Sequence, residues 1–409
     1  MPALRPLPTA PYRRTAGALL LALASALTGC STLPGWMILQ GRAEISDHQH
    51  FSNAPIARAA TPSPLPAQPA ALRWPGGLDD SAASAMLAEH HTVALLVLRR
   101  GVLVHEQYLN GFSRETVGTS FSAAKSVVSL LLGVAVAEGR VQGVDDPVTR
   151  YLPELLANDP RFAQITLRHL LMMRSGIDFQ EAYTVPWSQA ARFYLGPDLK
   201  AEVARLRIAG PPDQGFKYQS GDTQLLAMVV ARATATHLAR YLQDKLWQPM
   251  GAEFDASWSL DSAAGGQARA FCCLNARAVD YLRLGQLVLN QGRSASGAQL
   301  ISADWLRDSL AVQQRPGATD AQRRNIEQPG RRNTAFYGWQ WRRAPLPGSS
   351  GPDAAPEAVQ PGSHVYAEGL RGQYIYIVPE TQTVIVRLGR DRGPLFWPAW
   401  LGELARLNP

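Results

Sequence analysis

The chain has 409 residues, enough for one large domain or two of ordinary size, and its hydrophobic content of 46% is that of a globular protein. Its formal net charge of +7 comes mostly from scattered arginines, with small basic clusters such as Arg323-Arg324. A nucleic-acid surface needs basic residues grouped on one face with interleaved aromatic residues, so this composition argues against a nucleic-acid partner.

The first thirty residues are predicted to be a targeting segment. Three arginines precede an apolar run over 16–27, which is too short to span a bilayer. The run ends at Cys30 in the order Leu-Thr-Gly-Cys, which resembles the lipobox of bacterial lipoproteins. That resemblance implies a signal peptide over 1–29 and a lipid on Cys30 that anchors the protein in the cell envelope, facing the periplasm. Ser31 is compatible with the outer membrane, and the alternatives are an ordinary cleaved signal or an uncleaved anchor.

Residues 30–74 are expected to form a flexible tether to a folded domain over 75–409, because prolines and alanines alternate there with little periodicity. His48 and His50 lie in this stretch, but a metal site needs more converging ligands, so we expect no metal. Nothing in the sequence indicates an organic cofactor.

Strand and helix patterns alternate along the rest of the chain. Stretches rich in Val and Leu over 92–99 and 102–108 predict a β-hairpin, and extended character returns at 336–341, 373–378 and 383–388. Helical spacing covers 122–139, 148–155, 165–173, 197–208, 222–233, 238–247, 277–290, 302–313 and 398–407. We therefore expect an α+β fold in which an antiparallel sheet, built from both ends of the chain, is flanked by helices, with a helical subdomain inserted over about 140–300.

The neighbouring cysteines, Cys272 and Cys273, are expected to be buried thiols. Adjacent α-carbons lie closer together than ordinary disulfide geometry prefers. A protein of this size has a core large enough to be stable without a structural bridge.

Ser122 and Lys125 lie one turn apart at the start of a strongly apolar helix. Only four lysines occur in the chain, so a lysine beside this helix is unusual. Burial lowers the pKa of an amine, whereas a guanidinium stays protonated. Lys125 is therefore a candidate base that removes the proton from Ser122, the candidate nucleophile.

Acyl transfer also needs a second proton carrier and a site for the oxyanion. Tyr218, on a loop before the helix over 222–233, is the candidate carrier, because a nearby ammonium would lower the pKa of its phenol. The strand that opens at Gln373 follows small residues that let a substrate approach closely. The N–H groups of Gln373 and Ser122 are candidates for the oxyanion site.

Together these elements resemble the serine β-lactamase-like superfamily of penicillin-recognising hydrolases, in which Ser-x-x-Lys, a middle Tyr-x-Asn and a strand Lys-Thr-Gly occur in this order. The chain is most similar, over about 85–405, to the class C-like branch with its esterases and 6-aminohexanoate-dimer hydrolases. There the middle element can be Tyr-x-Ser, as in Tyr218-Gln219-Ser220. The resemblance implies a β-lactamase/transpeptidase-like fold. It also implies that Ser220 steadies the lysine and the substrate and that Tyr183 is a substrate-loop tyrosine.

One departure from the family pattern concerns the substrate. Leu370-Arg371-Gly372 stands where the family has Lys-Thr-Gly, so the usual carboxylate-binding lysine is missing. Either Arg371, beside Gly372, grips a substrate carboxylate in its place, or it faces solvent. We expect a hydrolase that cleaves a small ester or amide through an acyl-enzyme. The alternatives are a β-lactamase or D-amino-acid peptidase of the penicillin-binding type, and a non-catalytic envelope scaffold.

Overall fold

The computed structural model describes residues 37, 42–183, 185–263, 265–313, 336–346 and 360–409, and its main folded unit spans Ala43–Pro409. Cys30 and the expected signal peptide lie outside the described residues. Within the described part, none of the helices combines the length and the apolar character that crossing a bilayer requires.

A seven-stranded sheet forms the centre of this unit, in the order β3-β2-β13-β12-β11-β10-β9, with every neighbouring pair antiparallel. Its strands are β2 (Thr92–Arg99), β3 (Val102–Tyr108), β9 (Phe336–Tyr337), β10 (Arg342–Pro345), β11 (Pro361–Gly369), β12 (Gln373–Val378) and β13 (Thr383–Gly389). Strand β2 pairs with β13, so the sheet is built from both ends of the chain, which confirms the predicted α+β class. Strand β11 was not predicted, because its first half is poor in apolar residues.

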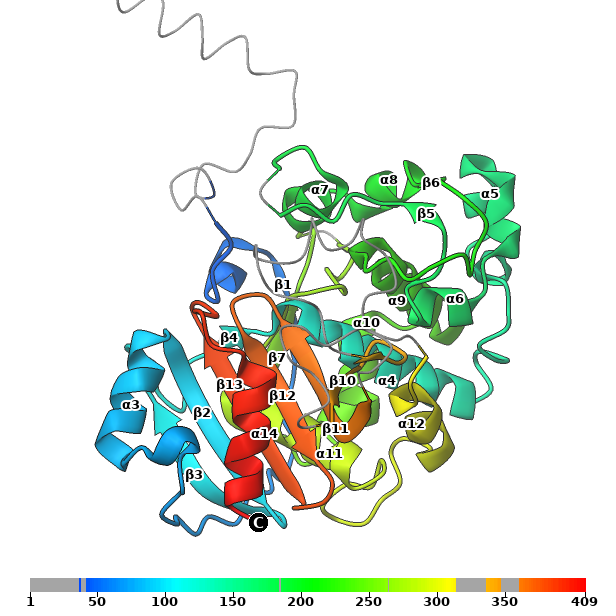
Figure 1. Ribbon diagram of the computed structural model, residues 1–409. Coiled ribbons are helices and arrows are strands. Elements are labelled where there is room, and N and C mark those ends of the chain that lie inside the picture. Colours follow the sequence, from blue (N-terminus) through cyan, green and yellow to red (C-terminus); the bar gives the residue numbers. More distant parts are fainter. Residues whose placement is uncertain (1–36, 38–41, 184, 264, 314–335, 347–359) are drawn as a thin grey trace, which may run out of the picture. The chain divides into compact units, whose positions relative to one another are not determined.

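Helices cover both faces of this sheet (Figure 1). On one face lie α3 (Asp80–Glu89) and α14 (Trp397–Leu407), and on the other lie α4 (Ala124–Ala137) and α11 (Ala278–Leu289). Side chains of a strand alternate between faces. Accordingly Leu95 packs in the core beneath α3 and α14, while Leu96 packs in the larger core with α4 and α11.

Helices dominate the region between the two halves of the sheet, as predicted. They include α5 (Leu155–Asn158), α6 (Leu167–Leu171), α7 (Gln189–Leu195), α8 (Leu199–Ala204), α9 (Ser220–Thr234), α10 (Leu238–Leu242), α12 (Ala303–Leu310) and the short turns η4 (Val148–Arg150), η5 (Pro160–Gln164) and η6 (Gln243–Trp247). Short strands interrupt them: β5 (Ile177–Asp178) pairs with β6 (Arg207–Ile208), while β7 (Ala256–Ser259) and β8 (Leu274–Ala276) belong to a four-stranded sheet, β1-β7-β8-β4. Helix α9 packs against α4, which brings the two predicted catalytic segments together.

The segment from residue 43 to residue 74 packs on the folded body, which corrects the expected flexible tether in this part. It carries η1 (Asp47–His50) and β1 (Asn53–Ile56), and β1 pairs with β7. The side chains of Ile45 and Ile56 are fully buried. The apolar residues here are isolated, so they show no periodicity. Their burial depends on partners far along the chain, such as Ala256 for Ile56 and Leu388 near Ile45.

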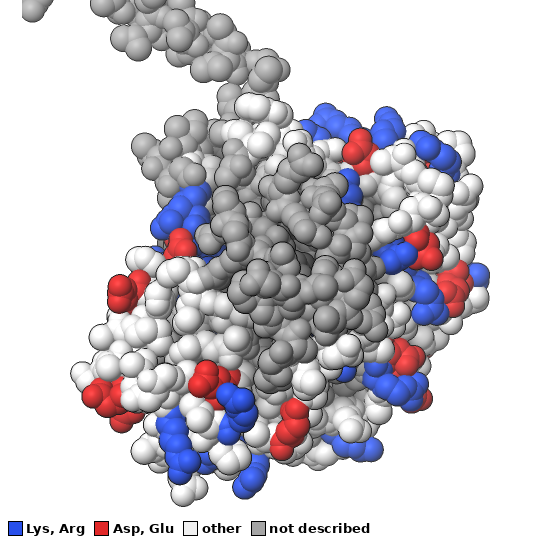
Figure 2. Space-filling view, in the orientation of Figure 1, with Lys and Arg blue, Asp and Glu red and all other residues white. Residues whose placement is uncertain are grey.

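Charged side chains are interspersed on the face of the molecule shown in Figure 2. Among the described residues of that face, Lys and Arg alternate with Asp and Glu around the rim and do not gather in one basic surface. Among the described residues, oppositely charged side chains also form close pairs, such as Arg168 with Asp145 and Arg174 with Asp213.

Replacing Ile45 with Ala should lower the free energy of unfolding by about 3 kcal/mol, because a large buried side chain leaves a cavity. Ile45 lies beside Gly118 and Leu388, and its carbonyl accepts the N–H of Thr119 at 2.9 Å. Urea denaturation measures the change, and Arg58→Ala, at an exposed position of the same segment, is the control. An Ile45→Ala variant as stable as the wild type would mean that the segment is a tether after all.

Candidate active site

Ser122 lies in a tight turn, η3 (Phe121–Ala123), directly before α4. Phe121 adopts a φ of 45°, a left-handed conformation that is strained for a bulky residue and persists only where the surroundings enforce it. Two strands grip this turn: the N–H of Ser120 donates to Leu274 O on β8 at 2.8 Å, and Gly369 on β11 lies so close that a Cβ there would be 2.2 Å from Ser120 O. The result is a partly exposed serine hydroxyl at the start of a buried helix.

Lys125 is buried on α4, with 2% of its surface exposed. Its Nζ lies 3.2 Å from Ser122 Oγ and 3.1 Å from Ser220 Oγ, and it donates to Phe271 O at 2.7 Å. Burial lowers the pKa of the Lys125 amine to about 8; the charge of Glu181 opposes this effect and that of Arg342 adds to it. An amine of this kind can accept a proton near neutral pH.

Tyr218 also lies beside Ser122. Its ring centre lies 5.1 Å from Lys125 Nζ, and 7% of its surface is exposed. Burial raises the pKa of the Tyr218 phenol, whereas the sequence argument expected the lysine to lower it. Desolvation outweighs the nearby charges, so the phenol keeps its proton at rest and is in the protonated form that a general acid needs.

A carboxylate that the sequence did not reveal completes the set. Glu181 is 3% exposed, and its oxygens accept hydrogen bonds from Ser220: Oε1 from the hydroxyl at 2.7 Å and Oε2 from the backbone N–H at 2.6 Å. The Tyr183 hydroxyl donates to Glu181 Oε1 at 2.5 Å. A chain of polar contacts thus runs from Lys125 through Ser220 to Glu181. No spacing rule points to an acidic residue in a loop, and only folding brings it to α9.

Gln373 opens β12 beside the turn that carries Ser122. Its side-chain amide forms hydrogen bonds to the backbone of Leu370 and of β13. Nε2 donates to Leu370 O at 3.0 Å and to Gly389 O at 2.7 Å, while Oε1 accepts the Gly389 N–H at 3.0 Å. These bonds fix the backbone at the position that the sequence assigns to the oxyanion site.

Arg371 does not join this set. Its Nε donates to Ala43 O at 3.0 Å and its guanidinium pairs with Asp391 at 3.2 Å, so its charge is committed to the N-terminal segment and to a loop. Arg371 therefore does not take the first of its two expected roles, binding a substrate carboxylate. Gly372 has a φ of 79°, and a Cβ there would lie 2.3 Å from the Arg387 guanidinium, so packing and not substrate approach requires this glycine.

Cys272 and Cys273 form a disulfide, which corrects the expected thiols. Cys273 has a φ of 69°, and this left-handed turn lets adjacent cysteines meet, a case that the argument from ordinary disulfide geometry ignored. The bridge lies between Phe271, whose carbonyl receives the Lys125 amine, and β8, which holds the Ser122 turn.

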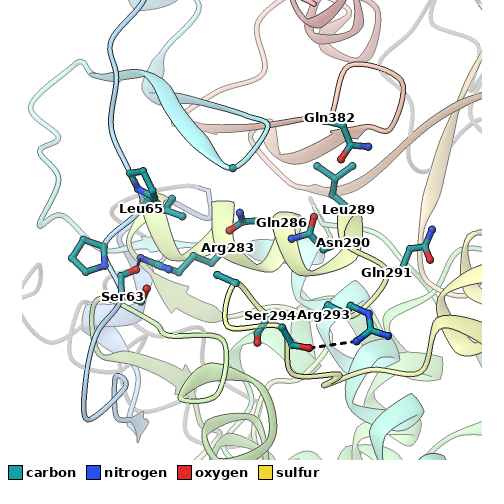
Figure 3. Close-up of a pocket in the computed structure, with 15 residues that line it drawn as sticks. Ser63, Leu65, Arg283, Gln286, Leu289, Asn290, Gln291, Arg293, Ser294 and Gln382 are labelled. Atoms are coloured by element: carbon teal, nitrogen blue, oxygen red, sulfur yellow. Dashed lines mark hydrogen bonds between the residues drawn. The ribbon is translucent and has the colours of Figure 1, made fainter.

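A pocket of about 610 Å³ opens between residues 63–66 and α11 (Figure 3). The guanidinium of Arg283 points toward the carbonyl of Ser63 there and donates to it. This pocket does not include Ser122, Lys125 or Tyr218, and neither do two further pockets lined by described residues. The described residues also contain no group of three or more His, Cys, Asp or Glu side chains placed to hold a metal ion.

Known proteins resemble this chain in sequence and in structure. The 6-aminohexanoate-dimer hydrolase of Paenarthrobacter ureafaciens is 28% identical over 319 residues, which are 74% of this chain and 73% of that protein. A candidate 6-aminohexanoate-dimer hydrolase of Bacillus anthracis has a similar structure, with a TM-score of 0.71 and 22% identity over 89% of this chain and 92% of its own. A class C β-lactamase in complex with cefoxitin has a TM-score of 0.56 and 15% identity, covering 80% of this chain and 96% of its own.

The family assignment agrees with the fold. The two structural neighbours share the β-lactamase/transpeptidase-like architecture described above, with helices around an antiparallel sheet. The family model named Beta-lactamase matches residues 80–396, which is most of the chain. The chain therefore belongs to the β-lactamase family and is a hydrolase of that superfamily.

Proposed function

We propose that this protein hydrolyses a small ester or amide through an acyl-enzyme on Ser122. The observation that carries the proposal is the buried Lys125 amine, which lies 3.2 Å from Ser122 Oγ and has its pKa lowered to about 8. Such an amine can be uncharged where a surface lysine would be an ammonium, and it then activates the serine as a nucleophile.

Acylation uses the contacts around Ser122. The uncharged Lys125 amine takes the proton from Ser122 Oγ, which forms a bond to the substrate carbonyl carbon, and the carbonyl oxygen becomes an oxyanion that faces the N–H groups of Ser122 and Gln373. Tyr218 gives its phenolic proton to the leaving alcohol or amine as that bond breaks, and it recovers a proton from the Lys125 ammonium. The products are an acyl-serine and a neutral leaving group.

Deacylation reverses the roles with water as the nucleophile. Lys125 takes a proton from the water, the hydroxide adds to the acyl carbon, and Ser122 leaves with the proton returned from the lysine. Glu181, which is hydrogen-bonded to Ser220, stabilises the ammonium form of Lys125 by its negative charge and so raises the pKa of the amine. The carboxylate and the burial therefore act in opposite directions on the same amine.

The substrate proposed is an open-chain ester or amide. A relative supports this choice: the Paenarthrobacter protein, which is 28% identical, is named a 6-aminohexanoate-dimer hydrolase. The strand lysine is replaced by Leu370, and Arg371 is held elsewhere, so the carboxylate grip that β-lactams and D-amino-acid peptides use is not present at that strand. A purely binding scaffold would gain nothing from a lysine buried against a serine.

Hydrolysis of a p-nitrophenyl ester should rise with pH through about 8, because the Lys125 pKa is lowered to about 8 and only the uncharged amine is a base. Lys125→Met should lower kcat/KM by about a thousandfold, the range expected for loss of a general base. Stopped assays across pH 5 to about 10 measure both effects. Lys200→Met, at an exposed position, is the control that should leave the profile unchanged. A profile that falls between neutrality and the Lys125 pKa would refute this role for the lysine.

We also propose that the protein is exported and anchored by a lipid on Cys30, in the outer membrane facing the periplasm. The supporting features are the basic start, the apolar run over 16–27 and the Leu-Thr-Gly-Cys sequence. Mass spectrometry of the mature chain should find acyl groups on Cys30, and Cys30→Ser should leave the protein unprocessed and out of the outer-membrane fraction. Ser31→Ala is the matched control. Acylation that survives in Cys30→Ser would contradict the anchor.

A further inference from the structure

A partly buried arginine lies beside Tyr218, on a strand that carries none of the sequence motifs. Arg342 is the first residue of β10, and 14% of its side chain is exposed. Its guanidinium carbon lies 5.5 Å from the centre of the Tyr218 ring and 5.9 Å from that of Tyr337. Lys125 Nζ lies 5.1 Å from the same Tyr218 ring. The Arg342 guanidinium, and Lys125 in its ammonium form, are thus both within the range of cation–π attraction of one tyrosine.

Arg342 shares its carboxylate partner with a second arginine, and Glu181 is a further anion that acts on the Tyr218 phenol. Arg342 Nε lies 2.9 Å from Glu368 Oε2 on β11, but Arg392 pairs with the other oxygen of the same carboxylate. The Tyr374 hydroxyl also donates to Glu368, at 3.0 Å. Two guanidinium groups therefore share one carboxylate, and only one of them, Arg342, reaches Tyr218 among the contacts described.

The sheet brings this charge to a site that lacks its expected lysine. Strand β10 pairs with β11, and Arg342 stands opposite Tyr366, two residues before Glu368 on the same face. Strand β11 ends at Gly369, immediately before Leu370, where the family pattern has its lysine. A cation is thus supplied by β10, the strand next to β11.

We propose that Arg342 is a positioning residue that takes the place of the absent strand lysine, holding the Tyr218 ring against Ser122 and favouring the departure of the phenolic proton. The inference rests on the proposed function. When Tyr218 gives its proton to the leaving group, the phenolate that forms is stabilised by the fixed charge beside it. The phenolate then takes the proton that Lys125 received from Ser122, so the site returns to its starting charge.

The same charge acts on both titrating groups. Arg342 opposes the rise that burial causes in the pKa of Tyr218, and it adds to the lowering of the pKa of Lys125. Without it, the phenol would be a poorer acid and the amine would hold its proton to higher pH. Both changes slow acyl transfer near neutrality.

The test compares two arginines that share Glu368. In the full-length protein, Arg342→Gln should lower kcat about thirtyfold, within the range for impaired acid–base catalysis, and should move the rising limb of the pH profile of ester hydrolysis to higher pH. Arg342→Lys, which keeps the charge, should restore part of the rate and of the limb. Arg392→Gln loses an ion pair to the same carboxylate but has no contact with Tyr218, so its limb should stay in place.

The outcomes separate the proposals. An Arg342→Gln limb at the wild-type pH, or equal losses of rate in the Arg342→Gln and Arg392→Gln variants, would overturn the role of Arg342. If Arg342→Gln does not fold, Glu368→Gln decides: removing the anion should move the limb to lower pH, and an unmoved limb overturns the inference. A separate result would contradict the proposed function: a Ser122→Ala variant that hydrolyses the ester at the wild-type rate.

Discussion

The removal of one amine from water is the constraint on which the site depends. Lys125 Nζ is surrounded by three oxygen atoms from three different places in the chain: Ser122 before α4, Ser220 at the start of α9, and the carbonyl of Phe271. Desolvation lowers the pKa of this amine to about 8, and the hydrogen bonds fix its position. The pairing of α4 with α9 and the turn before β8 can be understood as the scaffold for these three contacts.

Two charges of opposite sign near this amine shift its pKa in opposite directions. Glu181, reached through Ser220, stabilises the ammonium form, whereas Arg342, behind Tyr218, destabilises it. A base that must accept a proton and then release it needs both forms to be close in free energy. Behind Arg342, Glu368 on β11 pairs with its guanidinium, and Arg392 in the loop after β13 pairs with the same carboxylate.

Local patterns predicted the elements that depend on local sequence. The hairpin of β2 and β3, the strands β12 and β13 and the helices α11 and α14 appear close to their predicted bounds, because apolar periodicity specifies each of them. The proximity of Ser122 and Lys125 also follows from helix geometry.

Features that depend on distant partners were missed. Glu181 and Arg342 reach the site from a loop and from an adjacent strand, and no spacing along the chain relates them to Ser122. Arg371 was chosen because it follows Leu370 in sequence, but the left-handed backbone at Arg371, with a φ of 64°, accompanies a side chain bound to Asp391. The predicted lowering of the Tyr218 pKa was wrong for a related reason. Burial raises this pKa, and the extent of burial depends on the assembled core.

Covalent labelling tests the central claim, that Lys125 activates Ser122, most directly. Purified protein is treated with a fluorophosphonate over a range of pH, digested, and the modified peptide is sequenced by mass spectrometry. The account predicts a single adduct on Ser122, formed at a rate that rises with pH through the lysine pKa of about 8 and that collapses when Lys125 is replaced. An adduct on another residue, or labelling of Ser122 that proceeds equally fast without the Lys125 amine, would contradict it.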